Sequence, residues 1–151
     1  MAVNISDLKK LRTETGASIA DVRQALEESG GDLKGAREKI VQKGLDKATS
    51  KESREVKAGL VESYVHAGKV GVLVEVLCET DFVAKTDEFK TLAHELALQI
   101  ASMNPENKEE LLNQEYIRDP GQKIDNLIKT AIAKLGENIQ IGKFARISLG
   151  E

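Results

Sequence analysis

Side chains that could carry out catalysis or hold a metal ion are few in this sequence. Its two histidines are His66, in a predicted turn, and His94, in a predicted helix, and neither joins a recognisable set of metal ligands. The single cysteine, Cys78, ends an apolar run and is expected to be a buried, unreactive thiol. No glycine-rich phosphate-binding signature is present. We therefore expect no catalytic residue, no metal site and no cofactor, in a protein that is not an enzyme.

The most informative segment lies at a strand-to-helix corner and begins Thr80-Asp81-Phe82-Val83. It follows the apolar run Val70–Cys78, a predicted buried strand, and precedes a long amphipathic helix pattern. Phe82 could fold back into the core, as aromatic side chains usually do. The polar residues before it indicate a solvated corner and favour the alternative, in which Phe82 projects as a hydrophobic wedge for another protein. The pattern alone leaves both fates open.

Length and composition place the chain among ordinary globular proteins. Its 151 residues are 40% hydrophobic and 31% charged, and the formal net charge is −3. That charge argues against direct binding of nucleic acid, which relies on clustered basic residues. A lone cysteine indicates a reducing compartment. The N-terminus resembles no secretory signal, and no apolar stretch is long enough to span a membrane. We expect a cytoplasmic protein without membrane association.

The first 44 residues predict a three-helix module. Each helix has a candidate N-terminal cap, and each ends at glycine; the caps are Ser6, Ser18 and Asp32, and the glycines are Gly16, Gly30–Gly31 and Gly44. Residues 45–56 are rich in Lys, Ser, Glu and Ala and predict a linker, in part helical. Because the linker has little apolar content, we expect the module to pack weakly and to move.

Residues 57–151 predict an α+β core. A hairpin pairs residues 59–65 with Val70–Cys78 through a turn at His66–Lys69. Helices are expected from Asp87 to Met103, capped by Thr86, and over residues 124–135, ended by Gly136. The segment between them reads as loop with a short helical piece, and residues 138–149 alternate as a closing strand. The prediction is a three-stranded antiparallel sheet covered on one face by helices, with exposed edges that a second copy could cover.

Three segments together resemble a known family. Leu11-Arg12-x-x-Thr15-Gly16-Ala17-x-x-x-Asp21, followed by Ala25-Leu26, is similar to the signature of a ubiquitin-associated-like three-helix module. Thr80-Asp81-Phe82-Val83-Ala84-Lys85 and Leu135-Gly136-Glu137-Asn138-Ile139 are similar to two signatures of the core that follows this module. The motifs occur in the family's order and span nearly the whole chain, which resembles the bacterial translation elongation factor Ts family.

This resemblance implies a guanine-nucleotide exchange factor that promotes GDP release from elongation factor Tu, a GTPase. It implies that a loop enters the GTPase domain and disturbs its Mg²⁺ and phosphate contacts; the loop residues are Thr80, Asp81, Phe82 and Val83. It further implies that the N-terminal module contacts the same domain elsewhere, through Leu11, Arg12, Ile19 and Ala20.

The resemblance also bears on assembly. Long family members carry two core subdomains, whereas this chain has room for one and looks like the short form, in which two copies can pair their sheets. A homodimer through the core sheet is therefore expected. Some short members have a cysteine in the final strand, near Ala145 of this chain, so we expect a dimer without a covalent link.

The sequence also allows two other hypotheses. The three-helix module could make the protein a ubiquitin-associated-like adaptor that binds a peptide or helix without exchange activity. An enzyme acting on a small molecule would need a polar pocket around His66 or His94, which the sequence does not suggest.

Overall fold

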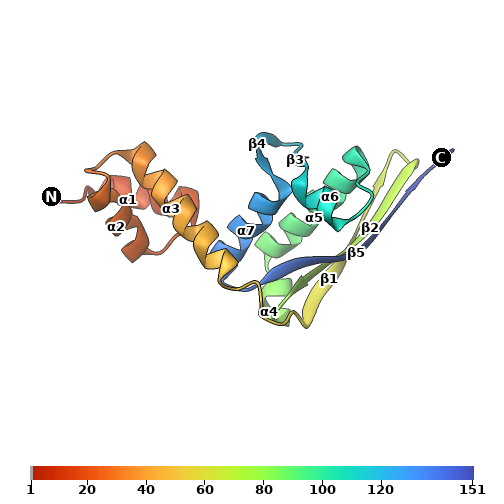
Figure 1. Ribbon diagram of the computed structural model, residues 1–151, viewed down its shortest axis with the longest axis horizontal. Helices are drawn as coiled ribbons and strands as arrows, with labels where there is room; N and C mark the ends of the chain where they lie inside the picture. Colours follow the sequence, from red (N-terminus) through yellow and green to blue (C-terminus); the bar gives the residue numbers. More distant parts are fainter. Residues whose placement is uncertain (1) are drawn as a thin grey trace.

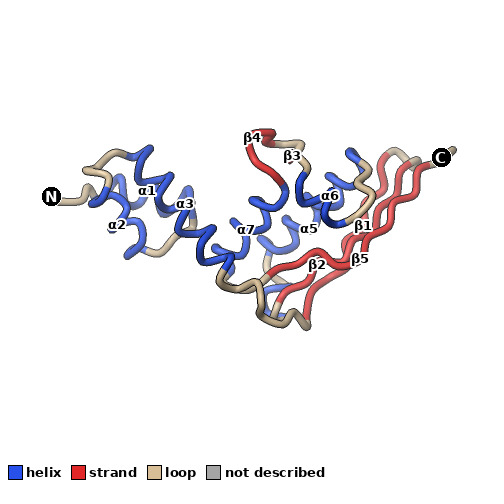
Figure 2. The backbone as a smooth tube through the Cα atoms, viewed as in Figure 1, coloured by secondary structure: helices blue, strands red, loops and turns tan. Residues whose placement is uncertain are grey.

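The computed structural model describes residues 2–151 and shows an elongated molecule with two parts (Figure 1). A three-helix bundle lies at one end, and a sheet with helices on one face forms the rest. The helices and strands follow the predicted order, apart from the one-turn helix α4 (Asp81–Ala84) and a small hairpin before the last helix (Figure 2). The α+β fold class predicted from sequence is confirmed.

The bundle consists of α1 (Ile5–Thr15), α2 (Ile19–Glu28) and α3 (Leu33–Thr49). Ser18 and Asp32 cap α2 and α3 as predicted, and Gly16 ends α1 in the left-handed conformation. The cap of α1 is Asn4 rather than the predicted Ser6, because the Asn4 side chain accepts the Ser6 backbone N–H at 2.8 Å. The three helices enclose their own small apolar cluster, formed by Leu11, Val22, Ala25, Leu26, Ala36 and Ile40.

Helix α3 does not end at Gly44, as predicted, but continues to Thr49. It packs against α7 (Ile124–Leu135) of the core, and Ala48 is buried in the core cluster. A β-carbon at Gly44 would lie 3.2 Å from the β-carbon of Ala133, so glycine allows the two helices to approach closely. This tertiary contact sustains the helix through its glycine. The module therefore packs on the core more closely than the linker composition predicts.

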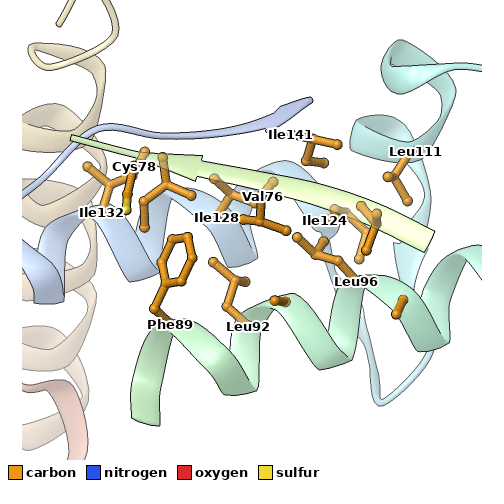
Figure 3. Packing of buried hydrophobic residues seen from close by; sticks show 14 of the residues in the cluster. Val76, Cys78, Phe89, Leu92, Leu96, Leu111, Ile124, Ile128, Ile132 and Ile141 are labelled. Carbon is orange, nitrogen blue, oxygen red and sulfur yellow. The ribbon is translucent and has the colours of Figure 1, made fainter. Parts of the chain in front are cut away.

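The core sheet has the order β1-β2-β5 and is antiparallel throughout. Strand β1 (Ala58–His66) turns at Ala67–Lys69 into β2 (Val70–Cys78), and β5 (Ile139–Ser148) pairs with the other side of β2. Side chains of β2 alternate between the two faces, so Val72, Val74, Val76 and Cys78 are buried. Helix α5 (Asp87–Met103) covers this inner face together with α7 (Figure 3).

The inner face of the sheet and the helices share one mainly aliphatic core, with Tyr116 buried in it and Phe144 packed against it. Phe89, at the start of α5, is fully buried and points toward the sheet (Figure 3). The other large members come from α5, α6, α7 and the strands, and include Leu92, Leu96, Ile100, Leu111, Ile124, Ile128, Ile132 and Ile141. Thr86 caps α5 and the helix ends after Met103, both as predicted, with Asn104 in the left-handed conformation.

The segment between α5 and α7 contains α6 (Lys108–Asn113) and a small hairpin of β3 (Glu115–Tyr116) and β4 (Asp119–Lys123). The short helix is predicted, but the hairpin is not. Its backbone is fastened by the buried Gln99 side chain, which donates to the Glu115 carbonyl at 3.0 Å and accepts the Ile117 N–H at 3.0 Å. Within residues 2–151, no helix is long and apolar enough to cross a lipid bilayer.

Candidate partner-binding site

The corner after β2 forms a single helical turn, α4 (Asp81–Ala84), with Thr80 as its cap. The Thr80 hydroxyl accepts the Val83 N–H at 3.3 Å. Neighbouring positions on a helix point about 100° apart. Accordingly Val83 is only 5% exposed and packs into the core, whereas Phe82 is 82% exposed. The turn thus holds a large aromatic ring in solvent while its own inner side is anchored.

The base of this turn is fastened from both sides. On the strand side, the Cys78 thiol donates to the Thr80 carbonyl oxygen at 3.2 Å. On the helix side, the Thr86 hydroxyl donates to the Val83 carbonyl at 2.7 Å and accepts the Phe89 N–H at 3.2 Å. Burial raises the pKa of the Cys78 thiol, which keeps it protonated and unreactive.

A carboxylate from a distant segment also reaches the corner. Glu137 follows the last residue of α7 and Gly136, and its side chain accepts the backbone N–H groups of Glu79 and Thr80 at 3.1 and 3.0 Å. Its second oxygen accepts the Thr80 hydroxyl at 2.7 Å. Sequence reasoning identified Glu137 within a family motif but assigned it no role. A separation of 57 residues from Thr80 leaves no local signal.

The four corner residues therefore differ in what they can offer a partner. Thr80, Asp81 and Phe82 are exposed, and Val83 is buried. Phe82 is the largest exposed apolar side chain of the turn, and polar groups flank it. Exposed aromatic side chains with such a setting are typical of interface anchors. The site can bind by apolar contact, and the described corner contains no group placed for covalent chemistry.

The residues expected to act in the N-terminal module are also divided by burial. Arg12, Ile19 and Ala20 are exposed, whereas Leu11 is fully buried in the small cluster of the bundle. Helices α1 and α2 lie at one end of the molecule and α4 lies at the base of the core, so the structure does not bring the two sets together (Figure 1). A partner that touches both must extend along the molecule.

The two histidines belong to a small aromatic cluster rather than to a pocket. The Tyr64 hydroxyl lies 2.8 Å from Nδ1 of His66, and the Tyr64 ring meets the His94 ring edge-on at a centroid distance of 6.0 Å. Both histidines are exposed. Within residues 2–151, no group of three or more potential ligand side chains could hold a metal ion.

The sheet face opposite the helices carries exposed apolar side chains. Val65, Gly71 and Ile147 are cross-strand neighbours, and Ser63, Leu73 and Ala145 form the next row on this face. Among the apolar members, Leu73 is 55% exposed, Val65 65% and Ile147 75%. Figure 1 shows the helices of the core on the other side of the sheet only, as far as the described chain extends.

Comparison with known proteins places this arrangement in a family. The family model described as Elongation factor TS matches residues 79–151, which include the exposed corner. An Elongation factor Ts from Coprothermobacter proteolyticus is 41% identical over 197 aligned positions, which cover 100% of both chains. Another Elongation factor Ts, from Herpetosiphon aurantiacus, is 39% identical over 196 positions and 99% of each chain.

Both alignments are longer than the 151 residues of this chain, so these relatives contain residues that have no counterpart here. The matches nevertheless extend through the three-helix bundle and the core alike. The chain belongs to the elongation factor Ts family.

Proposed function

We propose that the protein is a guanine-nucleotide exchange factor that promotes GDP release from elongation factor Tu in the cytoplasm. A role in translation elongation follows from the family, and the exposed Phe82 is the observation that supports the exchange mechanism. The ring enters the GTPase domain of the partner and disturbs the Mg²⁺ and phosphate contacts that retain GDP. The protein acts by binding alone, because the strain it imposes on its partner needs no covalent step.

The energy available from one phenylalanine is large enough for this role. Burial of ~150–250 Å² at ~25 cal/mol/Å² supplies roughly 4–6 kcal/mol as an upper limit before reorganisation of the partner. Coupling between two ligands is reciprocal. The protein therefore weakens nucleotide binding by the same factor by which nucleotide weakens its own binding, and it accelerates exchange without selecting GDP or GTP.

In both the corner and the N-terminal module, the exposed family residues are proposed to contact the partner and the buried ones to hold the site in place. Thr80, Asp81 and Phe82 contact the GTPase domain, and the buried Val83 keeps the turn seated on the core. In the module, Arg12, Ile19 and Ala20 supply contact surface, and the buried Leu11 holds α1 in place. We retain the division into a module (1–44), a linker (45–56) and a core (57–151) as a proposal that limited proteolysis tests.

The decisive measurement is release of fluorescent GDP from elongation factor Tu, with and without the protein. We expect Phe82→Ala to lower the rate of release about tenfold or more, as hot-spot truncations do. Met103→Ala serves as a matched control, because Met103 is a half-exposed apolar residue at the far end of α5. Equal rates for wild type and Phe82→Ala would refute the wedge. Tight binding of wild type without acceleration would favour the adaptor hypothesis.

We also propose that two copies associate through the core sheet. The support is the uncovered face with Val65, Leu73 and Ile147, together with free edges at β1 and β5 of the described sheet. Analytical ultracentrifugation at tens of micromolar tests this, with Leu73→Lys as the disrupting variant. A wild-type protein that sediments only as a monomer would contradict the dimer.

A further inference from the structure

Two segments far apart in the sequence exchange carboxylate hydrogen bonds beneath the exposed corner. The Glu137 carboxylate accepts both the Glu79 and Thr80 backbone N–H groups and the Thr80 hydroxyl, at 2.7–3.1 Å. In return, the Glu79 carboxylate accepts the Asn138 backbone N–H at 2.6 Å. Hydrogen bonds to an ionised acceptor are the strong ones. The pattern ties the end of β2 to the end of α7.

The corner needs such a support because local structure provides little. Helix α4 is a single turn, and isolated helices of that length are not stable in water. Phe82 is 82% exposed, so its own packing does not set its position. Val83 secures the inner side of the turn. Glu137 secures its beginning, where β2 has ended and the N–H groups of Glu79 and Thr80 have no strand to pair with.

Glu137 is itself held in place by its neighbours. Gly136 ends α7 with a φ of +78°, which turns the chain sharply and directs residues 137–138 toward the corner. Asn138 is 1% exposed, and its side-chain amide donates to the Arg54 carbonyl at 2.7 Å and the Glu52 carbonyl at 3.4 Å. Residues 137–138 therefore hydrogen-bond both to the beginning of the Phe82 corner and to residues 52–54, which follow the three-helix bundle.

We infer that Glu137 is a positioning residue for nucleotide exchange: its carboxylate keeps the Thr80–Phe82 turn in the geometry that binds the GTPase. This inference rests on the proposed function. Without the carboxylate, the turn samples other conformations, and the apparent affinity falls by the fraction of molecules that remain competent. Once the complex has formed, Phe82 occupies the same place. The half-saturating concentration therefore rises, whereas the maximal release rate is preserved.

Glu137→Ala tests this separation in the GDP-release assay, measured as rate against concentration of the protein. We expect the half-saturating concentration to rise about fivefold or more, in line with the loss of hydrogen bonds to a charged group, and the maximal rate to stay within about twofold of wild type. Phe82→Ala should instead lower the maximal rate. Glu137→Gln should restore exchange, because its amide oxygen accepts both N–H groups and its nitrogen donates to the Thr80 hydroxyl oxygen.

The matched control is Glu95→Ala, at a second carboxylate that bridges segments by short bonds. Glu95 accepts the Tyr116 hydroxyl and the Arg118 guanidinium, both at 2.6 Å, on the β3–β4 side of the core. It should leave the half-saturating concentration unchanged. An equal shift for Glu95→Ala and Glu137→Ala, no shift for Glu137→Ala, or no rescue by Glu137→Gln would overturn the inference. If Glu137→Ala does not fold, Glu137→Asp keeps the charge but shortens its reach, and the same rise is expected.

A second readout needs no partner and so separates this inference from the proposed function. Hydrogen exchange of the Glu79 and Thr80 amides in the isolated protein should accelerate at least about tenfold in Glu137→Ala, with the amides of α5 unaffected. Unchanged exchange at both amides would refute the positioning role. Failure of wild type to accelerate GDP release would refute the proposed function alone.

Discussion

The two surfaces expected to meet a partner are built in opposite ways. The corner at Phe82 is one helical turn fixed to the large core by Val83 and by long-range bonds from Glu137. The N-terminal module has its own small apolar cluster and joins the core along α3 and α7. The first surface is rigid because the rest of the protein holds it. The second has its own apolar cluster, and its main contact with the core is the packing of α3 on α7.

The same contrast appears between two identical side chains seven positions apart. Phe82 is 82% exposed, and Phe89 is fully buried against the sheet. Both lie beside a threonine cap, Thr80 for α4 and Thr86 for α5. The difference follows the position after the cap and not the residue type: Phe89, like the buried Val83, lies three residues after its cap, whereas Phe82 lies two residues after its cap. One phenylalanine stabilises the protein, and the other is available for binding.

The largest expected effect is a difference in the free energy of unfolding between alanine variants of these two phenylalanines. Phe89→Ala removes a fully buried ring from the main core and should lower the free energy of unfolding by about 3–5 kcal/mol. Phe82→Ala should change it by no more than about 0.5 kcal/mol, because an exposed ring makes few contacts to lose. Urea unfolding followed by circular dichroism measures both. Similar losses for the two variants would mean that Phe82 packs inward in solution.

The docking of the module gives the next effect. Gly44→Leu introduces a side chain where even a β-carbon would lie 3.2 Å from that of Ala133, and we expect about 1–3 kcal/mol of overpacking. The module should separate from α7, which small-angle scattering detects as a larger radius of gyration. Glu38→Leu, at an exposed position of the same helix, is the control. A radius unchanged in both variants would show that the α3–α7 contact does not set the orientation of the module.

Ion pairs within the module give a smaller, pH-dependent effect. The ammonium groups of Lys43 and Lys47, 2.6 and 2.8 Å from the Asp21 carboxylate, hold its pKa well below the usual range. A lowered folded-state pKa stabilises the protein above the unfolded-state value of about 4, and this contribution is lost as the pH falls below it. Asp21→Asn should therefore cost up to about 1 kcal/mol at pH 7.

The difference between wild type and Asp21→Asn should shrink progressively as the pH is lowered from about 4, because the carboxyl of the unfolded wild type is then protonated while that of the folded protein is still ionised. Thermal unfolding of both proteins at several pH values measures it. Glu109→Gln, at an exposed position outside the module, controls for the general effect of removing one negative charge. A difference that grows toward acid pH would show that the ion pairs do not stabilise α2 against α3.

Much of the fold could be predicted because its signals are local. Caps such as Ser18, Asp32 and Thr86 mark their helices within three or four residues, and the apolar, β-branched run Val70–Cys78 indicates a strand directly. The exposure of Phe82 was only favoured, since a polar flank cannot show which way a single turn faces. The direction of the turn is set by the neighbouring Val83, whose side chain packs into the core. That contact exists only in the folded protein.

Apart from the cap of α1, which is Asn4 and not Ser6, the features that sequence reasoning missed depend on distant contacts. Helix α3 passes through Gly44 because α7 supports it, and the β3–β4 hairpin forms around the Gln99 side chain. The bond from Glu137 to Thr80 connects residues 57 positions apart. Each of these contacts overrides or adds to the local preference, so no pattern within a window of ten residues could show it.

The smallest effect concerns a thiol that reports on the corner without taking part in it. Cys78 is fully buried beneath Thr80, and burial raises the pKa of its thiol, so the neutral form is retained as the pH rises past the ordinary value of about 8.5. Labelling by a thiol reagent at pH 8 should therefore be slow in the folded protein. Because this is the chain's single cysteine, labelling reports only those openings that expose the end of β2 beside the corner. Glu137→Ala should accelerate it, and Gly44→Leu, which acts on the module, should not. If both variants accelerated labelling equally, the two regions would open together, and their apparent independence would be wrong.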